Sequence, residues 1–453
     1  PREIKSPPPA ELLKRSCKLL EGLGGVSKIP ELQRRILFTI LLLGVYRIGV
    51  HIPTPGIDNV ALLAYFEHAK GSLFGLMDMF AGGAFSQFSI FALGIMPYIS
   101  SSIILQLLTI AVPHLERLSK EGEAGRRKIT QYTRYGTVIL SMIQGFGIAF
   151  GLQQMAGPSG APIVLNPGIG FVLLTMITLT SGTAFIMWLG ETITEKGIGN
   201  GISLIIFAGI VCRIPAAIGN TFRLAQANEL GVLVILFIVL LMVVVVGAIV
   251  FVEGGQRRIP VQYAKRVVGR KMYGGQTTHL PLKINTSGVI PPIFASSVIM
   301  FPATIANFAP QTWMKDIASY LVPGRLAYEV LYVAFIFFFC YFYTAVTFKP
   351  DDVAENMKKF GGYVPGIRPG KKTAEYIENV LEKLTFSGAI YVSIICVLPS
   401  ILISQLNVPF YFGGTALLIV VGVAMDTASQ IEAHLLTRQY DGFMKKGHIV
   451  RRR

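Results

Sequence analysis

Long apolar stretches alternate with shorter polar segments along the whole chain, and most of the polar segments contain Lys or Arg. A helix needs about 20 apolar residues to cross the hydrocarbon core of a bilayer. The pattern predicts ten membrane-spanning helices, at residues 36–50, 85–112, 129–152, 169–190, 198–214, 230–252, 286–308, 326–348, 384–406 and 411–436. The first and fifth are short for a straight crossing. We therefore expect an all-α polytopic membrane protein.

The stretch at residues 71–108 departs from a simple spanning pattern. Residues 72–80 are apolar but too short to span, because glycines bound them at positions 71, 82 and 83, and we expect a short re-entrant helix there. The following part is long enough to span, yet Pro97 lies inside it and three serines, Ser100, Ser101 and Ser102, follow. Proline kinks a helix, and in lipid the carbonyl that it frees needs another partner. The sequence therefore predicts a broken, serine-rich helix beside a water-accessible pathway.

Composition and charge agree with a membrane protein and orient it. The 453-residue chain is 52% hydrophobic and only 15% charged, whereas soluble domains carry about 25% charged residues. Its net charge is +16, but the basic residues cluster between the spans, so we expect no specific DNA binding. The chain ends and alternate loops are basic, while residues 153–168 contain no Lys or Arg, which places both termini in the cytoplasm. The proline-rich N-terminus has no apolar core, so we expect no cleavable signal peptide.

Ten spans with both ends on one side divide into five and five. An odd number of helices in each half makes the halves insert in opposite senses, so the second helix corresponds to the seventh. The seventh carries PPIFASSVI around Pro291, which echoes PYISSSII around Pro97. Interrupted hydrophobic segments at corresponding places in two halves point to a transport site. We therefore expect two inverted five-helix halves with a short re-entrant plug helix.

These features predict the organisation of the whole chain. Residues 1–33 form a cytoplasmic segment whose part at 10–23 is an amphipathic helix, suited to an anionic membrane face. The expected divisions that follow are an N-terminal half at 34–214 with the re-entrant segment at 71–84, an outer hinge at 215–229, a C-terminal half at 230–436 with cytoplasmic loops at 253–285 and 349–375, and a cytoplasmic tail at 437–453.

Two of the basic loops are too long to be simple connections. Residues 253–283 alternate apolar and polar positions, as in a projecting hairpin, and residues 349–372 contain a Gly- and Pro-rich turn with Arg368 near its tip. Positive-inside topology and anionic lipid binding explain the charge of these loops but not their length. Docking of a cytoplasmic partner explains both, and both interpretations stay open at this point.

Chemistry-bearing residues are few within the spans. Arg47 lies near the outer end of the first helix, where its side chain can reach the interface. Asp426 in the tenth helix is a candidate for ion coupling, with a satisfied contact between helices as the alternative. The sequence GIGNG at 197–201 is a weak phosphate-binding pattern, and a tight turn after the fourth helix explains it better. There is no HExxH, GxSxG or P-loop motif, and the four cysteines fit no metal or disulfide spacing. We expect no enzyme activity, cofactor or metal.

Isoleucine recurs in the interrupted helices. The six positions are Ile95, Ile99, Ile202, Ile206, Ile293 and Ile419. Within the second and fifth helices the pairs are four residues apart, so each pair shares a helix face. On pattern alone, ordinary helix packing explains them.

Several longer motifs carry a resemblance to a known family. IFALGIMPYISSSIILQLL, QYTRYGT, MWLGETITEKGIGNGIS, GQRRIPVQYAKR, GVIPPIFASS, GGYVPGIRPG and FYFGGT closely resemble the bacterial SecY family, the pore subunits of the Sec preprotein translocase (SecYEG). The likeness covers essentially all ten spans. It implies an hourglass channel that passes unfolded preproteins across the membrane and releases hydrophobic helices into lipid.

The resemblance also implies roles for residues. The six isoleucines correspond to a pore ring that narrows around a passing chain, in place of ordinary packing. The short piece after Gly71 resembles the plug, with Ser72, Leu73, Phe74, Leu76, Met77, Met79 and Phe80. Helices two and seven resemble the lateral gate, with Pro97, Ser100, Ser101, Ser102, Pro291, Ser296 and Ser297. The docking surface for a motor or a ribosome corresponds to Arg257, Arg258, Lys265, Arg266 and Arg368.

The partners that the resemblance implies follow from the same family. They are SecE-type and SecG-type small membrane subunits, the SecA motor ATPase, the ribosome, preprotein signal sequences and anionic lipids. The location implied is the bacterial plasma (inner) membrane. Because the chain has no nucleotide site of its own, the energy for transport must come from a partner.

An ion-coupled small-solute transporter built on an inverted repeat is the main rival, and a passive scaffold or lipid-binding protein is a third possibility. The transporter needs Asp426, whereas the channel needs the isoleucines, and a scaffold needs neither.

Overall fold

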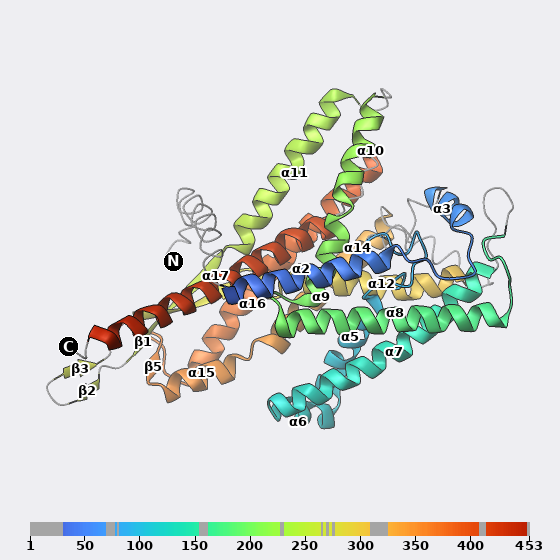
Figure 1. Cartoon of the computed structure of the whole chain (residues 1–453). Coiled ribbons are helices and arrows are strands. Elements are labelled where there is room, and N and C mark those ends of the chain that lie inside the picture. The colour runs from blue at the N-terminus through green and yellow to red at the C-terminus, as the bar shows by residue number, and fades with distance from the viewer. Residues whose placement is uncertain are drawn as a thin grey trace. The chain divides into compact units, whose positions relative to one another are not determined.

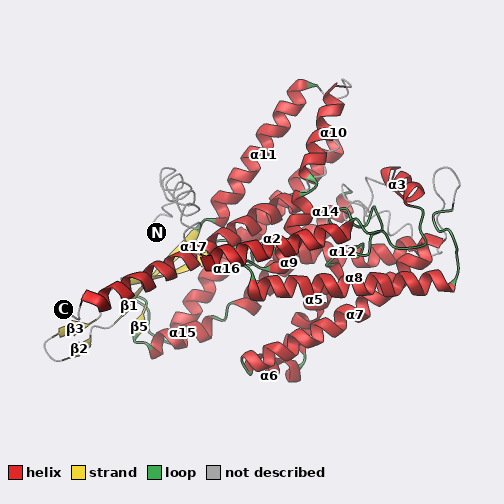
Figure 2. Cartoon of the chain, in the orientation of Figure 1, coloured by secondary structure: helices red, strands yellow, loops and turns green. Residues whose placement is uncertain are grey.

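A computed structural model shows a chain made almost entirely of helices, with a few short strands in two segments (Figures 1 and 2). It describes residues 30–68, 78, 81–153, 162–226, 231–263, 266–268, 271–273, 277–308, 325–406 and 414–450. The expected amphipathic helix at 10–23 and the seven named plug residues lie outside these ranges. The chain divides into two compact units.

The first unit comprises residues 1–226, 297–325 and 423–453. Its helices are α2 (Pro30–Val50), α3 (Asn59–His68), α5 (Met96–Ala111), α6 (Pro113–Lys120), α7 (Glu123–Gln153), α8 (Ile169–Lys196), α9 (Gly201–Val211) and α10 (Ile214–Gln226). Helix α7 packs on α5 and α8, and α8 also packs on α2 and α9. Helices α12 (Ile290–Phe308) and α17 (Gly414–Val450) enter this unit at residues 297 and 423.

The second unit comprises residues 227–296 and 326–422. It contains α11 (Val232–Glu253), α14 (Leu326–Thr347), α15 (Pro350–Lys359), α16 (Lys371–Leu406) and the first parts of α12 and α17. Its strands are β1 (Gln256–Tyr263), β2 (Arg266–Val268), β3 (Lys271–Tyr273), β4 (Thr277–Lys283) and β5 (Gly362–Tyr363). Helix α16 packs on α14 and α15.

Each of the ten predicted spans contains a helix. Among the described residues, seven helices are long and apolar enough to cross a membrane, and the bent pair of α5 and α6 makes an eighth if it is one span. The chain is therefore a multi-pass membrane protein, as the hydrophobic pattern predicts. The expected connection at 215–229 is helical as far as Gln226, in α10.

The second predicted span is wrong at its start. Residues 81–95 form successive turns, and the helix begins only at Met96. Pro97 consequently lies in the first turn of α5 and does not kink a helix interior. The first turn tolerates proline because its backbone donors have no partner within the helix. Pro291 and Pro292 occupy the same place in α12, which begins at Ile290.

The end of α5 also has a local cause. Val112 is extended, with φ −107° and ψ 113°, and the chain bends by 99° into α6. The next residue is Pro113, whose ring disfavours a helical conformation at the residue before it. Pro113 then opens α6 as its first residue.

Two helices extend beyond the predicted spans. Helix α16 begins 13 residues before the predicted start at 384, and α17 continues to Val450, through most of the expected tail. Hydropathy marks only the apolar part of a helix, whereas hydrogen bonding continues into polar sequence. Helix α15 within the basic loop at 349–372 was likewise missed, because its ten residues PDDVAENMKK are mostly polar.

The hairpin predicted in the basic loop at 253–283 is confirmed. Strands β1 and β4 pair antiparallel from Gln256 opposite Lys283 to Gln262 opposite Thr277. Strand β5 pairs with the other edge of β1, so the sheet order is β4-β1-β5. The end of β1 therefore joins the two basic loops into one sheet.

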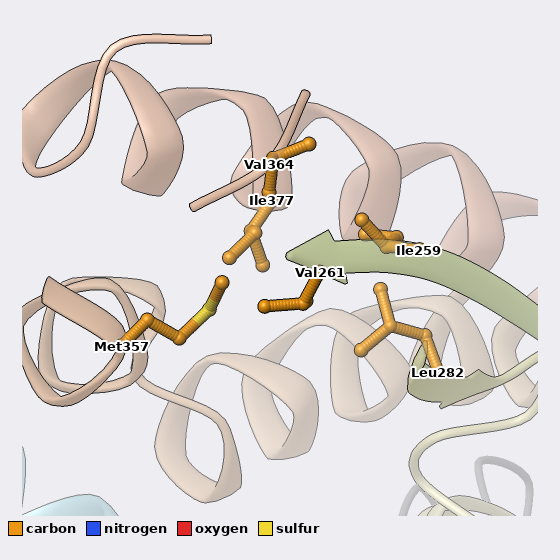
Figure 3. Close-up of a cluster of buried hydrophobic side chains, with 6 residues drawn as sticks. All are labelled: Ile259, Val261, Leu282, Met357, Val364 and Ile377. Atoms are coloured by element: carbon orange, nitrogen blue, oxygen red, sulfur yellow. The ribbon is translucent and has the colours of Figure 1, made fainter. Parts of the chain in front are cut away.

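A hydrophobic cluster holds these loops on α16. Successive strand residues point to opposite faces, so Ile259 and Val261 of β1 are buried while their neighbours are exposed or partly exposed. Figure 3 shows the side chains of the cluster converging: Ile259, Val261, Leu282, Met357, Val364 and Ile377. They come from both loops and from α16, so the cluster fixes the loops relative to that helix.

We predict that Ile377→Ala loosens both loops. Ile377 is fully buried in this cluster, and truncating a buried isoleucine to alanine costs about 2–5 kcal/mol. The onset temperature of tryptic cleavage within residues 256–283 should fall. Phe360→Ala is the control, because Phe360 is 76% exposed on the second basic loop, outside the cluster. Equal cleavage profiles for the two variants would show that the cluster does not hold the loops.

Candidate functional site

The candidate site begins with the irregular segment at residues 81–95. Its turns need left-handed backbone at Gly82, Gly83 and Gly94, with φ of +66°, +90° and +57°. Phe88 also has positive φ, at +41°, which is rare for a residue with a bulky side chain. Its carbonyl accepts a hydrogen bond from the Thr54 amide at 2.9 Å. The surrounding contacts therefore determine this conformation.

Small residues let this segment lie directly on helices. A side chain at Gly182 of α8 would collide with the Ile90 carbonyl, and one at Gly49 of α2 would collide with the Phe91 ring. The Phe91 ring stacks on Phe185 with centroids 5.9 Å apart. The irregular backbone is thereby covered by protein, as it must be where water is absent.

The first two of the six isoleucines, Ile95 and Ile99, lie at the start of α5, directly after the irregular segment. Ile95 is the residue that precedes the helix, and its carbonyl accepts the Ile99 amide at 3.1 Å. Both side chains are buried. On α9 Ile206 is buried and Ile202 partly exposed.

The remaining two isoleucines belong to the second unit. Ile293 lies in the first turn of α12, and Ile419 lies in the second turn of α17; they are 6% and 0% exposed. Isoleucine therefore occupies corresponding places at the starts of α5 and α12. A common axis for all six remains a prediction.

The predicted gate residues divide by what they contact. The Ser101 hydroxyl donates to the Thr133 carbonyl of α7 at 2.9 Å, so it fastens α5 to α7. Ser296 donates within its own helix, to the Ile293 carbonyl at 2.9 Å. The Ser297 hydroxyl lies 3.9 Å from the sulfur of Met96, the first residue of α5. The other predicted gate residues are Pro97 and Pro291, which are buried in the first turns of their helices, and Ser100 and Ser102, which are partly exposed.

The GIGNG sequence forms the tight turn expected after α8. Asn200 caps α9, because its side-chain oxygen accepts the amides of Ile202 and Ser203 at 3.1 and 3.4 Å. The Gly199 amide donates to Gln430 of α17 at 3.0 Å. Sequence analysis missed this cap, although Asn directly before an apolar run is a strong N-cap signal.

The predicted docking residues lie on the strands and the turn of the basic loops. Arg257 and Arg258 are exposed on β1, and Arg368 is exposed on the Gly- and Pro-rich turn. The Arg368 carbonyl accepts the Thr373 hydroxyl at 3.0 Å, which fixes the turn to the start of α16. Three of the five predicted docking residues are therefore accessible to a partner from solvent.

The other two docking residues lie further along the first basic loop. Arg266 lies on β2, and Lys265 is outside the described residues. Acidic side chains accompany the basic ones on the second loop, where the hydrogen bond from Lys359 lowers the pKa of the Glu355 carboxyl on α15. That carboxylate is therefore charged at neutral pH and already has a basic partner.

Three arginine contacts near the site were not predicted as such. Arg47 donates to the Gly82 carbonyl at 2.7 Å, where the sequence indicated a side chain reaching for the interface. Arg134 of α7 binds Glu191 of α8 through two contacts, at 2.8 and 3.1 Å. The third contact, at 2.8 Å, joins Arg213 to Asp78. Partners more than 30 residues apart give no local sequence signal.

Asp426, the residue that an ion-coupled transporter would need, is exposed on α17. Within the described ranges, no group of three or more His, Cys, Asp or Glu side chains could hold a metal ion.

Comparison with known proteins finds similar sequences over most of the chain. A family model described as SecY matches residues 89–428. The protein translocase subunit SecY of Escherichia coli is 52% identical over 425 residues, which cover 93% of this chain and 96% of the relative. The same subunit of Aquifex aeolicus is 46% identical over 427 residues, covering 94% and 100%.

Solved structures agree in fold. One described as "The structure of a protein conducting channel" aligns with a TM-score of 0.64 at 18% identity, over 90% of this chain and 96% of that one. Sec61 in the canine ribosome-channel complex from the endoplasmic reticulum aligns with a TM-score of 0.60 at 18% identity, over the same shares. Since the family model and relatives of about half identity span nearly its full length, the chain belongs to the SecY family of protein translocase subunits.

Proposed function

We propose that this translocase subunit forms the pore itself, with the six isoleucines as its narrowest ring. The observation that carries the proposal is that five of them are each at most 6% exposed: Ile95, Ile99, Ile206, Ile293 and Ile419. A hydrophobic constriction excludes ions by dewetting. Aliphatic side chains also offer an extended chain no hydrogen bond to hold it, so passage does not depend on sequence.

We further propose that α5 and α12 form a lateral gate. The contact of Met96 with Ser297 is a weak one, between a thioether sulfur and a hydroxyl at 3.9 Å. Small residues allow close helix packing without strong polar locking. The Ser101 hydroxyl binds α7, so it holds α5 on α7 and takes no part in the proposed contact between α5 and α12. A hydrophobic signal helix exposed at such a gate can partition into lipid.

The proposed docking surface is the sheet β4-β1-β5 with the turn at Arg368. Exposed arginines lie on it, and the buried cluster beneath holds it firmly on α16. A rigid basic surface suits a partner that delivers force or a nascent chain, the SecA motor or a ribosome. SecE-type and SecG-type subunits, signal sequences and anionic lipids are the other proposed partners. The proposed location is the bacterial inner membrane, with both termini and this surface in the cytoplasm.

The family is one of non-catalytic channel subunits, so the proposal draws the energy of transport from these partners. The ion-coupled transporter loses its support with the family assignment. A passive scaffold does not explain the relatives, which are named as translocase subunits.

Polar substitution in the ring should make the resting channel leak. We predict that Ile95→Asn combined with Ile293→Asn raises ion conductance in planar bilayers, because an amide side chain stabilises water in the constriction. Ile104→Asn is the control, since Ile104 is 46% exposed on α5, the helix that follows Ile95. Unchanged conductance in the double variant would refute the ring.

Joining the gate helices should stop lateral release. With Cys17 and Cys212 replaced by serine, we expect a short thiol cross-linker between Met96→Cys and Ser297→Cys to block insertion of a signal helix into lipid. Met96→Cys alone, treated in the same way, should retain insertion. If the cross-linked protein still inserts signal helices, α5 and α12 do not part during release.

Charge reversal on the docking surface should uncouple the partner. We predict that Arg368→Glu lowers motor-dependent preprotein import or ribosome binding by roughly tenfold, the effect of about 1.4 kcal/mol of binding free energy. Lys371→Glu makes the same charge change at an exposed neighbouring position and should have a smaller effect. Import and ribosome binding that both match wild type would exclude the role given to Arg368.

A further inference from the structure

Asp78 has a buried carboxylate that binds two other residues, Ser86 and Arg213. The residue is only 5% exposed. One carboxylate oxygen lies 2.8 Å from the Arg213 guanidinium, and the other accepts the Ser86 amide at 2.8 Å. Its main-chain carbonyl accepts the Gly83 amide at 2.9 Å. Asp78 therefore ties the turn at residues 83–86 to a residue far along the chain.

Arg213 lies at the break between two helices. Helix α9 ends at Val211 and α10 begins at Ile214, and the Arg213 carbonyl accepts the Ala217 amide at 3.0 Å, as the residue that precedes a helix does. Its side chain is 37% exposed, against 7% for that of Asp78. The pair is thus more exposed on the arginine side than on the carboxylate side.

Other contacts hold the same turn through its backbone. The Tyr46 hydroxyl donates to the Ala81 carbonyl at 3.1 Å, and Arg47 donates to the Gly82 carbonyl at 2.7 Å. A side chain at Gly82 would lie 2.7 Å from the Gly209 Cα, so the turn sits directly on α9. These contacts use main-chain atoms of the turn, whereas the contact between Asp78 and Arg213 joins two opposite charges.

The ion pair has properties that suit a separable contact. Burying the Asp78 carboxylate costs solvation, and the attraction of Arg213 offsets part of that cost. If the turn moves away from α9, water can solvate both groups. If one partner is removed while the turn stays, the other remains as an uncompensated charge, which is strongly unfavourable.

We propose that Asp78 and Arg213 are positioning residues that clasp the turn at residues 81–86 onto α9 in the resting channel. The clasp separates when the pore opens. This inference rests on the proposed channel function, because only a channel needs a resting position for this turn.

The test compares resting ion conductance in planar bilayers for the full chain with its partner subunits. Arg213→Gln and Asp78→Asn should each raise the resting conductance by roughly tenfold, and Arg213→Lys, which keeps the charge, should stay near wild type. Because the two groups act on each other, the double variant should leak less than the product of the single effects. Arg223→Gln removes the same charge from an exposed place on α10 and should leave conductance unchanged.

A second measurement follows the turn directly. In a background with Cys17 and Cys212 replaced by serine, Ser86→Cys should react faster with a water-soluble maleimide when Arg213→Gln is added, and at the starting rate with Arg213→Lys. This readout stands even if Asp78→Asn fails to fold.

The outcomes separate this inference from the proposed function. If Arg213→Gln matches wild type in conductance and in labelling while preproteins are transported, the clasp is wrong and the channel stands. If the wild-type complex transports no preprotein, the channel proposal itself fails. Equal leak from Arg213→Lys and Arg213→Gln would show that packing, and not charge, positions the turn.

Discussion

The need to satisfy every backbone polar group away from water governs this structure. Within the helices the chain satisfies its own amides and carbonyls, and that is why ten apolar stretches become helices. Residues 81–95 are not helical, and they satisfy their groups partly through local turns, as when the Ser89 amide donates to the Ala84 carbonyl at 2.9 Å. Other groups find partners in the segment that follows α2: the Thr54 amide donates to the Phe88 carbonyl and the Ile90 amide to the Ile52 carbonyl, at 2.9 and 3.0 Å.

The same constraint explains where glycine and proline occur. Proline can begin a helix without losing a hydrogen bond, so α5 and α12 both start with proline in their first turn. Glycine permits the close approach of irregular backbone to a helix, as Gly182 does for Ile90. The irregular segment at residues 81–95 thus begins at a glycine-rich turn and ends at a helix that has proline in its first turn.

Charged side chains within the first unit hold segments of the chain in position. Arg47 and Arg213 are charged groups among apolar residues, and each binds an oxygen of the segment at 78–82. Arg134 joins two neighbouring helices through Glu191. The isoleucines, by contrast, carry no polar group in their side chains. Polar contacts therefore fix the segment at 78–82, while the side chains of the proposed ring offer no hydrogen bond to a moving chain.

Local pattern was sufficient for much of this fold. Apolar length predicted ten stretches that each contain a helix, and the alternation in residues 253–283 predicted the hairpin of β1 with β4. The motifs around Pro97 and Pro291 lie at the starts of α5 and α12. Tertiary structure alone decided that Ser101 faces α7 and that Asp78 meets Arg213. Each of these depends on which distant groups lie close enough to replace lost hydrogen bonds or to pair charges, and residue spacing along one chain carries no information about such distances.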